Sequence, residues 1–310
     1  MNRLTVFMPV YNAECFLEKA VESILDQTYR EFDFLVIDDG STDNSHRILE
    51  GYAEKDARII LYENERNKGV CYTRNRGLEL CQTEYIAFMD ADDIAPLNRL
   101  EKEIAFLDSH QELAGVGGIA QSIDESGEVI PGMFPLFQNP DYIKANMMFE
   151  NTLANGSVML CTNIYKKHGI RYWDKEFAED YRFFSEYLQY GKIGNLNEVM
   201  QQYRKVSSGL TQTFKNRKDM VRKQASDEIH KFWFESYGFC FLEEEENILL
   251  KCFGEDGRTE SEDELRSLYK ALSSMCTQAE TIGLENSAMI KVVCRKQYGK
   301  QVSKAFWLWG

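Results

Sequence analysis

The 310-residue sequence predicts an α/β protein with a mostly parallel sheet flanked by helices, followed by a helical C-terminal region. Short apolar runs alternate four times with segments of helical periodicity between residues 4 and 107. A hairpin pattern then appears, and beyond about residue 213 the periodicity is helical throughout. We therefore expect one domain over residues 1–212, built from halves 1–110 and 111–212, and a helical region over 213–310.

The first strand is predicted at residues 4–8, which are β-rich and apolar. Pro9, Val10, Tyr11 and Asn12 end it. Asn12 is a suitable N-cap, and from Phe16 apolar residues recur at helical spacing.

The second strand is predicted at residues 32–37 and runs directly into Asp38 and Asp39. Either Ser41 or Thr42 is expected to cap the following helix, which carries Ile48, Leu49 and Tyr52. A third strand over residues 58–62 and a helix from about Val70 to Leu80 come next.

The fourth strand, residues 85–89, ends in three carboxylates, Asp90, Asp92 and Asp93. A helix carrying Leu97, Leu100, Ile104 and Leu107 follows. Ligands of open α/β sheets bind at the carboxyl ends of the strands, and three of these four strands end in polar residues. The pattern therefore indicates a nucleotide site, although the sequence has neither a Gly-x-Gly-x-x-Gly motif nor a P-loop.

Three neighbouring acids repel each other unless a cation lies among them. Hard oxygen ligands suit Mg²⁺ or Mn²⁺, and magnesium fills its remaining positions with water and substrate phosphate. Asp90, Ala91 and Asp92 therefore predict a metal site for a diphosphate. The alternative is a solvated acidic turn that caps the next helix.

The second half is predicted to hold a hairpin over residues 116–130, a strand over 156–160, a helix that residues 177–180 open, and a strand over 199–204. Helical patterns follow at 229–234, 248–253 and 265–272.

Composition limits the function classes. The net charge of −14 argues against a nucleic-acid partner, and no apolar run is long enough to span a bilayer. The 8 cysteines form no Cys-x-x-Cys pair, so buried free thiols are expected at Cys15, Cys71, Cys81 and Cys161. With no signal-peptide pattern at the start, these features favour the cytoplasm. The 4 histidines show no metal spacing and are assigned no role.

The motifs occur in an order that resembles family 2 glycosyltransferases of the GT-A fold. The matching segments lie within residues 1–210: 9–12, 38–41, 67–69 with 74–77, 90–93, and 179–180. The resemblance implies a nucleotide-sugar donor, inversion at the anomeric carbon and a saccharide or glycolipid acceptor.

By resemblance, Asp92 holds Mn²⁺ or Mg²⁺, while Asp90 and Ala91 lie near the donor ribose or sugar. Asp39, with Asp38 beside it, matches the contact to base and ribose. A carboxylate accepts the imide N–H of uracil, so a UDP donor is favoured. Pro9 and Tyr11, with Val10 and Asn12, would wall the base, since tyrosine provides stacking area.

Asp180 matches the family's catalytic base, and Glu179 would contact the acceptor. The alternative is that both acids only favour a helix N-terminus electrostatically. Arg74 would hold the diphosphate or brace Asp39, unless it is simply a helix-surface arginine. Trp173 would stack on a sugar or belong to the core.

Residues 201–204 are similar to the Gln-x-x-Arg segment of some relatives, but Lys205 replaces their usual Trp or His, which argues against a processive synthase. Two other classes remain: a nucleotidyltransferase that makes nucleotide sugars, and an inactive nucleotide-binding scaffold. Residues 286–310 carry five basic and no acidic residues and end in Phe306, Trp307, Leu308 and Trp309. They predict either peripheral membrane contact or packing on the protein itself.

Overall fold

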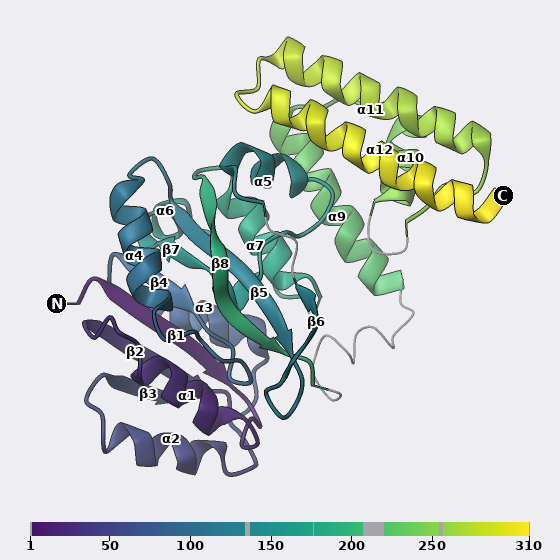
Figure 1. Ribbon diagram of the computed structural model, residues 1–310. Coiled ribbons are helices and arrows are strands. Elements are labelled where there is room, and N and C mark those ends of the chain that lie inside the picture. Colours follow the sequence, from purple (N-terminus) through teal and green to yellow (C-terminus); the bar gives the residue numbers. More distant parts are fainter. Residues whose placement is uncertain (1, 134–136, 176, 207–219, 254–256, 310) are drawn as a thin grey trace. The chain divides into compact units, whose positions relative to one another are not determined.

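The computed structural model describes residues 2–133, 137–175, 177–206, 220–253 and 257–309 (Figure 1). The chain forms two compact units. The first comprises Met1–Gln138 and Leu153–Arg217, and the second comprises Asn139–Thr152 and Lys218–Gly310. The predicted boundary at residue 212 lies outside the described residues, and one segment of the predicted half 111–212 groups instead with the helical unit.

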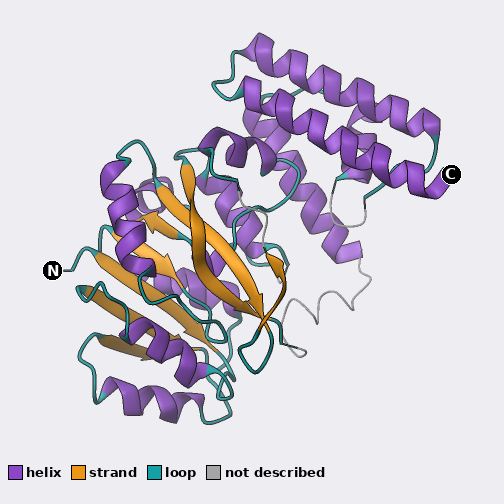
Figure 2. Cartoon of the chain, viewed as in Figure 1, coloured by secondary structure: helices purple, strands orange, loops and turns teal. Residues whose placement is uncertain are grey.

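The predicted mostly parallel sheet with flanking helices is confirmed in the first unit (Figure 2). Its N-terminal half has the parallel strand order β3-β2-β1-β4. The strands are β1 (Leu4–Val10), β2 (Phe32–Asp38), β3 (Ile59–Glu63) and β4 (Tyr85–Phe88). The helices are α1 (Leu17–Leu25), α2 (Ser45–Ala53), α3 (Val70–Leu80) and α4 (Arg99–Ser109).

The predicted hairpin is also confirmed, because β5 pairs antiparallel with β6. β7 joins the two halves of the sheet by pairing antiparallel with β4 and β5, and β8 runs parallel to β5. The elements here are β5 (Gly115–Ile123), β6 (Val129–Met133), a 3₁₀ turn η1 (Asn155–Ser157), β7 (Met159–Cys161), α6 (Thr162–His168), α7 (Glu179–Tyr187) and β8 (Ile193–Arg204).

The alternation of side chains along β1 sends residues to two packed faces of the sheet. Val6 and Met8 are fully buried in the core that also contains Val21 of α1. Phe7 points to the opposite face, where its ring would lie 2.4 Å from a Cβ placed on Gly77 of α3. Only glycine allows this close approach, which brings α3 against the strand that ends at the predicted site.

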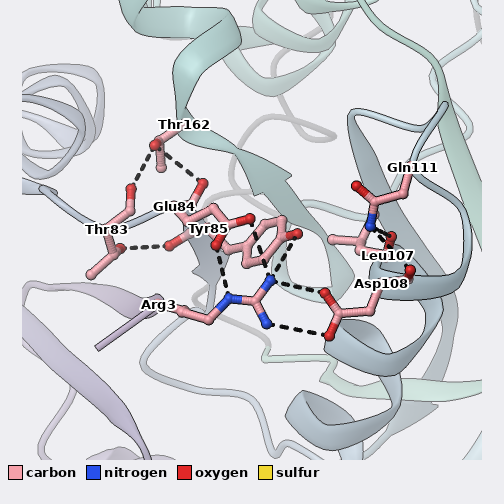
Figure 3. Close-up of polar contacts among 8 residues, drawn as sticks. All are labelled: Arg3, Thr83, Glu84, Tyr85, Leu107, Asp108, Gln111 and Thr162. Atoms are coloured by element: carbon pink, nitrogen blue, oxygen red, sulfur yellow. Dashed lines mark hydrogen bonds and ion pairs between the residues drawn. The ribbon is translucent and has the colours of Figure 1, made fainter. Parts of the chain in front are cut away.

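A polar cluster ties together the amino ends of β1 and β4, opposite the strand ends that carry the acids (Figure 3). Arg3 lies 2.8 Å from Glu84 and 2.9 Å from Asp108, and all three side chains are about half exposed. Exposed ion pairs contribute little to the free energy of unfolding, so we assign this cluster only the role of aligning the amino ends of β1 and β4.

Several local predictions were wrong. Asn12 does not cap α1: its φ is 47° and the helix begins at Leu17. Neither Ser41 nor Thr42 caps α2, which begins at Ser45. The Ser41 hydroxyl donates to Asp38 instead, and the Thr42 amide donates to Asn12. The described cysteines are all free, as expected, but of the four predicted to be buried only Cys81 is: Cys71 and Cys161 are partly buried and Cys15 is exposed.

The second unit is helical. It contains α5 (Pro140–Asn146), α9 (Met220–Tyr237), α10 (Glu243–Cys252), α11 (Glu262–Ile282) and α12 (Ser287–Trp309). α12 packs against α11 and α5. None of the described helices combines the length and apolarity that crossing a bilayer requires.

Candidate active site

β1, β2 and β4 are neighbouring parallel strands (Figure 1), and the acidic motifs lie at the carboxyl ends of β2 and β4. Val10 pairs with Asp38 across β1 and β2. On the other side of β1, the amide of Met89 donates to the carbonyl of Phe7, so Asp90 follows immediately at the same edge. Parallel pairing therefore brings together the ends of three segments that are far apart in the sequence.

Asp38 is fully buried and organises the loop after β2. Its Oδ1 accepts hydrogen bonds from the Ser41 amide (3.1 Å) and hydroxyl (2.6 Å), and its Oδ2 lies 3.0 Å from His46 Nδ1. The turn is made possible by Gly40, whose φ is 68° and whose added Cβ would lie 2.6 Å from the backbone of Arg66.

Asp39 holds the loop that leads into α3. It accepts hydrogen bonds from Asn64 Nδ2 (2.7 Å), the Lys68 amide (2.9 Å) and the Gly69 amide (2.9 Å). Asp39 is 3% exposed, so its carboxylate is fixed by three donors rather than free in solution.

Tyr11 directly follows β1 and is exposed, with 46% of its surface accessible to solvent. Asn12 joins this segment to the loop after β2, because its amide donates to Ser41 Oγ (3.0 Å) and its side chain accepts from the Thr42 amide (2.8 Å). Pro9 is partly buried and Val10 is buried. The segment therefore has an exposed aromatic ring next to Asn12, which links the two loops.

The acids after β4 are held by the end of β8. Buried Asp93 accepts hydrogen bonds from the Gln201 side chain and from the Arg204 amide (2.7 Å). The Arg204 guanidinium donates to the Asp92 carbonyl (2.7 Å) and to the carbonyl of Asp124 (2.9 Å). The Gln-x-x-Arg segment thus fixes the backbone that carries the acids.

Burial, followed by the charge of Asp90, raises the pKa of Asp92 to about 6. Burial and the charges of Asp92 and Asp90 also raise the pKa of Asp93 well above its ordinary value. Clustered carboxylates with raised pKa values favour a cation, and carboxylate oxygens are the ligands that Mg²⁺ and Mn²⁺ prefer. The residues present therefore fit a divalent cation, with Ala91 buried between Asp90 and Asp92.

Arg74 connects the two halves of the site. Its Nη1 lies 2.6 Å from Glu179 Oε1 and its Nη2 lies 3.1 Å from Asp90 Oδ1. The guanidinium also lies over the Tyr172 ring, 5.4 Å from the centroid. Arg74 is 7% exposed, so it is not a helix-surface arginine. Its ion pairs are with Asp90 and Glu179, whereas Asp39 is held by Asn64, Lys68 and Gly69.

Glu179 and Asp180 open α7, as predicted. The preceding residue, Ala178, has a φ of 55°, a left-handed conformation that costs energy in a non-glycine residue. Burial, followed by the charge of Glu179, raises the pKa of Asp180 to about 7, although Arg74 opposes the shift. A carboxylate with this pKa is poised to exchange a proton near neutral pH.

Trp173 is partly buried, and Lys175 Nζ lies 4.8 Å from its ring centroid. Its neighbour Tyr172 belongs to the core, where it stacks on Phe183 at 4.3 Å. Asn75 of α3 fixes this segment by exchanging two 2.8 Å hydrogen bonds with the Tyr172 backbone.

Sequence reasoning gave no role in this arrangement to His46 or Asn75, and it noted Gln201 and Arg204 only as part of a segment similar to that of some relatives. The Gln-x-x-Arg spacing of residues 201–204 was the signal for the last two. Their contact with Asp92 and Asp93 joins residues more than 100 positions apart, so spacing alone could not reveal it. Nothing in the sequence marked His46.

Comparison with known proteins agrees with this geometry. Residues 5–168 match the family described as "Glycosyl transferase family 2". An uncharacterised glycosyltransferase of Haemophilus influenzae is 30% identical over 247 residues, which cover 76% of this chain and 75% of the relative. The minor teichoic acid biosynthesis protein GgaB of Bacillus subtilis is 37% identical over 109 residues, covering 34% of this chain and 12% of that protein.

Two solved structures share the fold. TarS of S. aureus, residues 1–349 in complex with UDP-GlcNAc, superposes with a TM-score of 0.64 at 18% identity, covering 96% of this chain and 92% of that one. A mannosyltransferase of Pyrobaculum calidifontis in complex with GDP-Man and Mn²⁺ has a TM-score of 0.53 at 14% identity, covering 100% and 88%. On the family match and these relatives, the chain belongs to glycosyltransferase family 2 and is a glycosyltransferase.

Proposed function

We propose that this glycosyltransferase inverts the anomeric centre while moving one sugar from a UDP-sugar to a hydroxyl of a saccharide or glycolipid. The observation that carries the proposal is the bridge made by Arg74. It links Asp90, at the predicted donor site, to Glu179, which adjoins the predicted base. A bridge of this kind holds a donor and an acceptor group in register for direct displacement.

In the proposed step, the acceptor hydroxyl oxygen forms a bond to the anomeric carbon while the bond from that carbon to the diphosphate breaks. The electron pair leaves with the nucleoside diphosphate, and the hydroxyl proton passes to Asp180. The raised pKa of Asp180, about 7, suits a general base at neutral pH. Glu179 and Trp173 would orient the acceptor.

Asp92, with Asp90 beside it, would hold Mn²⁺ or Mg²⁺. A divalent cation there offsets the negative charge that develops on the leaving diphosphate. Burial and, second, the charge of Asp90 raise the pKa of Asp92 to about 6, and a cation bound there would favour its ionised form.

The preference for uracil follows from Asp39. Three hydrogen bonds occupy its carboxylate, which can accept about four, so one position is left for the imide N–H of uracil. The exposed ring of Tyr11 is available to stack on the base, with Pro9 beside it.

We also propose that the acceptor belongs to surface-polysaccharide synthesis, at the cytoplasmic face of the membrane. The resemblance to GgaB, named for minor teichoic acid biosynthesis, supports this class of acceptor. Of the functions considered from the sequence, the family match leaves the nucleotidyltransferase and the inactive scaffold without support.

Calorimetry with UDP and with GDP, each with and without Mn²⁺, tests the donor assignment. We expect UDP to bind more tightly than GDP and only with Mn²⁺, and Asp92→Asn to weaken UDP binding at least tenfold. Asp174→Asn, an exposed acid outside the motifs, is the control. A preference for GDP would overturn the choice of base, and unchanged metal dependence in Asp92→Asn would overturn the metal assignment.

A further inference from the structure

A second group of metal-ligand side chains lies on the outer edge of the sheet. It is formed by His46 and Glu50 of α2 and by Glu63 at the end of β3, with Asp38 of β2 behind the histidine. Asp38, His46 and Glu63 offer ligand atoms that all lie within 4.8 Å of one another. None of these residues contributes to the Asp90–Asp92 site.

The carboxylate of Asp38 fixes the orientation of the imidazole. It is fully buried and lies 3.0 Å from His46 Nδ1, which places the proton on Nδ1 and leaves Nε2 as a lone-pair donor on the side of Glu50 and Glu63. A carboxylate behind a histidine in this way is the usual support for a histidine that binds a metal.

Two further carboxylates converge on Nε2. Glu50 Oε1 lies 3.5 Å and Glu63 Oε2 lies 3.9 Å from that nitrogen. Ligands about 2.0–2.2 Å from a tetrahedral zinc ion lie roughly 3.3–3.6 Å apart, so Glu50 is already at that spacing from Nε2 and Glu63 lies slightly beyond it. Both glutamates are more than half exposed, so their side chains can turn toward an ion bound at Nε2.

The charges of this group are not balanced by basic side chains. Among the described residues, Glu50 and Glu63 form no ion pair with a lysine or arginine. Arg76, the nearest guanidinium contact, donates to the backbone carbonyl of Glu63 rather than to its carboxylate. Three carboxylates around one imidazole therefore call for a cation.

We propose that His46, Glu50 and Glu63 bind a first-row divalent transition cation, best matched by Zn²⁺ with water as the fourth ligand, and that Asp38 orients His46 for it. One imidazole with two carboxylates suits Zn²⁺, whereas all-oxygen sets suit Mg²⁺. The site is separate from the predicted donor metal.

A cation bound at this site would affect the two loops beside it. Asp38 also holds Ser41, and Ser41 accepts from the Asn12 amide. A cation on His46 would therefore stiffen the two loops that we propose to contact the nucleotide. This consequence rests on the proposed function, whereas binding of the cation does not.

Zinc titration of chelator-treated Asp92→Asn protein by calorimetry tests the proposal, since that background removes the predicted donor metal. We expect one zinc ion per chain, bound at least tenfold more weakly in His46→Gln and in Glu63→Gln. His168→Gln is the control, because His168 stacks on Tyr190 away from these acids. Cobalt in place of zinc should give the visible absorption of a tetrahedral site, and His46→Gln should abolish it.

Equal zinc affinity in His46→Gln and in its background would overturn the proposal, as would the absence of any zinc binding. If no zinc binds, a protonated His46 would supply the positive charge that pairs with the carboxylates. Circular dichroism without metal confirms that each variant is folded. UDP binding by the wild-type protein is measured separately, so failure of the donor assignment and failure of this site are distinguishable.

Discussion

Asp180 is the residue on which the proposed chemistry depends. We expect Asp180→Asn to retain UDP binding and to lose about 10²-fold or more in turnover, the scale typical of losing a general base. Calorimetry and a transfer assay measure the two effects separately. The control is again Asp174→Asn, which lies six residues earlier and is exposed. Retained turnover with lost donor binding would make Asp180 a donor-site residue instead.

The pKa of Asp180 also sets a pH dependence. Its protonated form cannot accept a proton, so kcat should rise with pH through about 7. Because the charge of Glu179 raises that pKa, Glu179→Gln should move the rising limb of the profile to lower pH. Profiles of kcat against pH for both proteins provide the measurement. A limb that stays in place, or moves to higher pH, would contradict the electrostatic coupling.

Local sequence signals predicted which strand ends lie together, but not the contacts between their side chains. Asp38, Asp39, Asp90 and Asp92 were chosen as site residues because they follow parallel strands, and the pairing of β1 with β2 and β4 brings those strand ends together. The two bonds of Arg74 could not be predicted, since one of them reaches Glu179 across 105 positions. Such a contact depends on how α3 and α7 pack, which no local pattern encodes.

At the scale of elements, a buried ion pair supports the strand that carries the acids. Arg99 and Glu103 of α4 are fully buried and lie 3.0 Å apart. Arg99 Nη2 also donates to the carbonyl of Phe88, the last residue of β4 (3.0 Å). Burial raises the pKa of Glu103 to about 7, although Arg99 opposes the shift. The pair therefore fixes the strand end while keeping its own charges compensated.

We expect Arg99→Met to lower the free energy of unfolding by about 3–5 kcal/mol, because it leaves Glu103 buried without a partner. The double variant Arg99→Met/Glu103→Leu should recover most of that loss. Denaturant unfolding measures both. Lys102→Met is the control on the same helix, because Lys102 pairs with Glu198 at a more exposed position. Additive losses in the double variant would show that the two side chains contribute independently.

The periodicity of the sequence predicted strands and helices well, and the structure has α3 over the predicted residues 70–80. The predicted helix caps were wrong where the side chains form tertiary hydrogen bonds instead of capping a helix. Asn12, Ser41 and Thr42 were expected to cap helices because of their residue types. They bind each other across the loops after β1 and β2, a use that depends on strand pairing rather than on local sequence.

At the scale of the whole molecule, the sequence did not show which chain segments make up the helical unit. Residues 139–152 belong to it although they precede the end of the first unit. Within this unit, Lys300 of α12 lies 2.8 Å from Glu150, and the Phe149 ring packs on Phe253 at 4.5 Å. Removing the chain from Asn286 onward would therefore strip α5 and α11 of a packing partner. A truncation is a poor test of what α12 does.

Charge reversal on α12 tests membrane contact without that damage. Lys291 and Arg295 lie on an exposed part of the helix, and Lys291 makes only a half-exposed ion pair with Glu280 at 3.3 Å. Basic residues near an anionic surface contribute about 1 kcal/mol each. The aromatic residues 306–309, also expected at the membrane, have side chains outside what the structure describes.

We expect the full-length protein to float with anionic liposomes at low salt and to be released at high salt, since the attraction is screened. The double variant Lys291→Glu/Arg295→Glu should bind those liposomes at least tenfold more weakly, because each reversal replaces attraction with repulsion. The matched control is Arg266→Glu/Lys270→Glu, which reverses two exposed basic residues of α11 and changes the net charge by the same amount. Equal flotation of the double variant and the control, or no flotation of the wild-type protein at low salt, would refute membrane association through α12. The basic face of this helix would then serve the unit's own ion pairs alone.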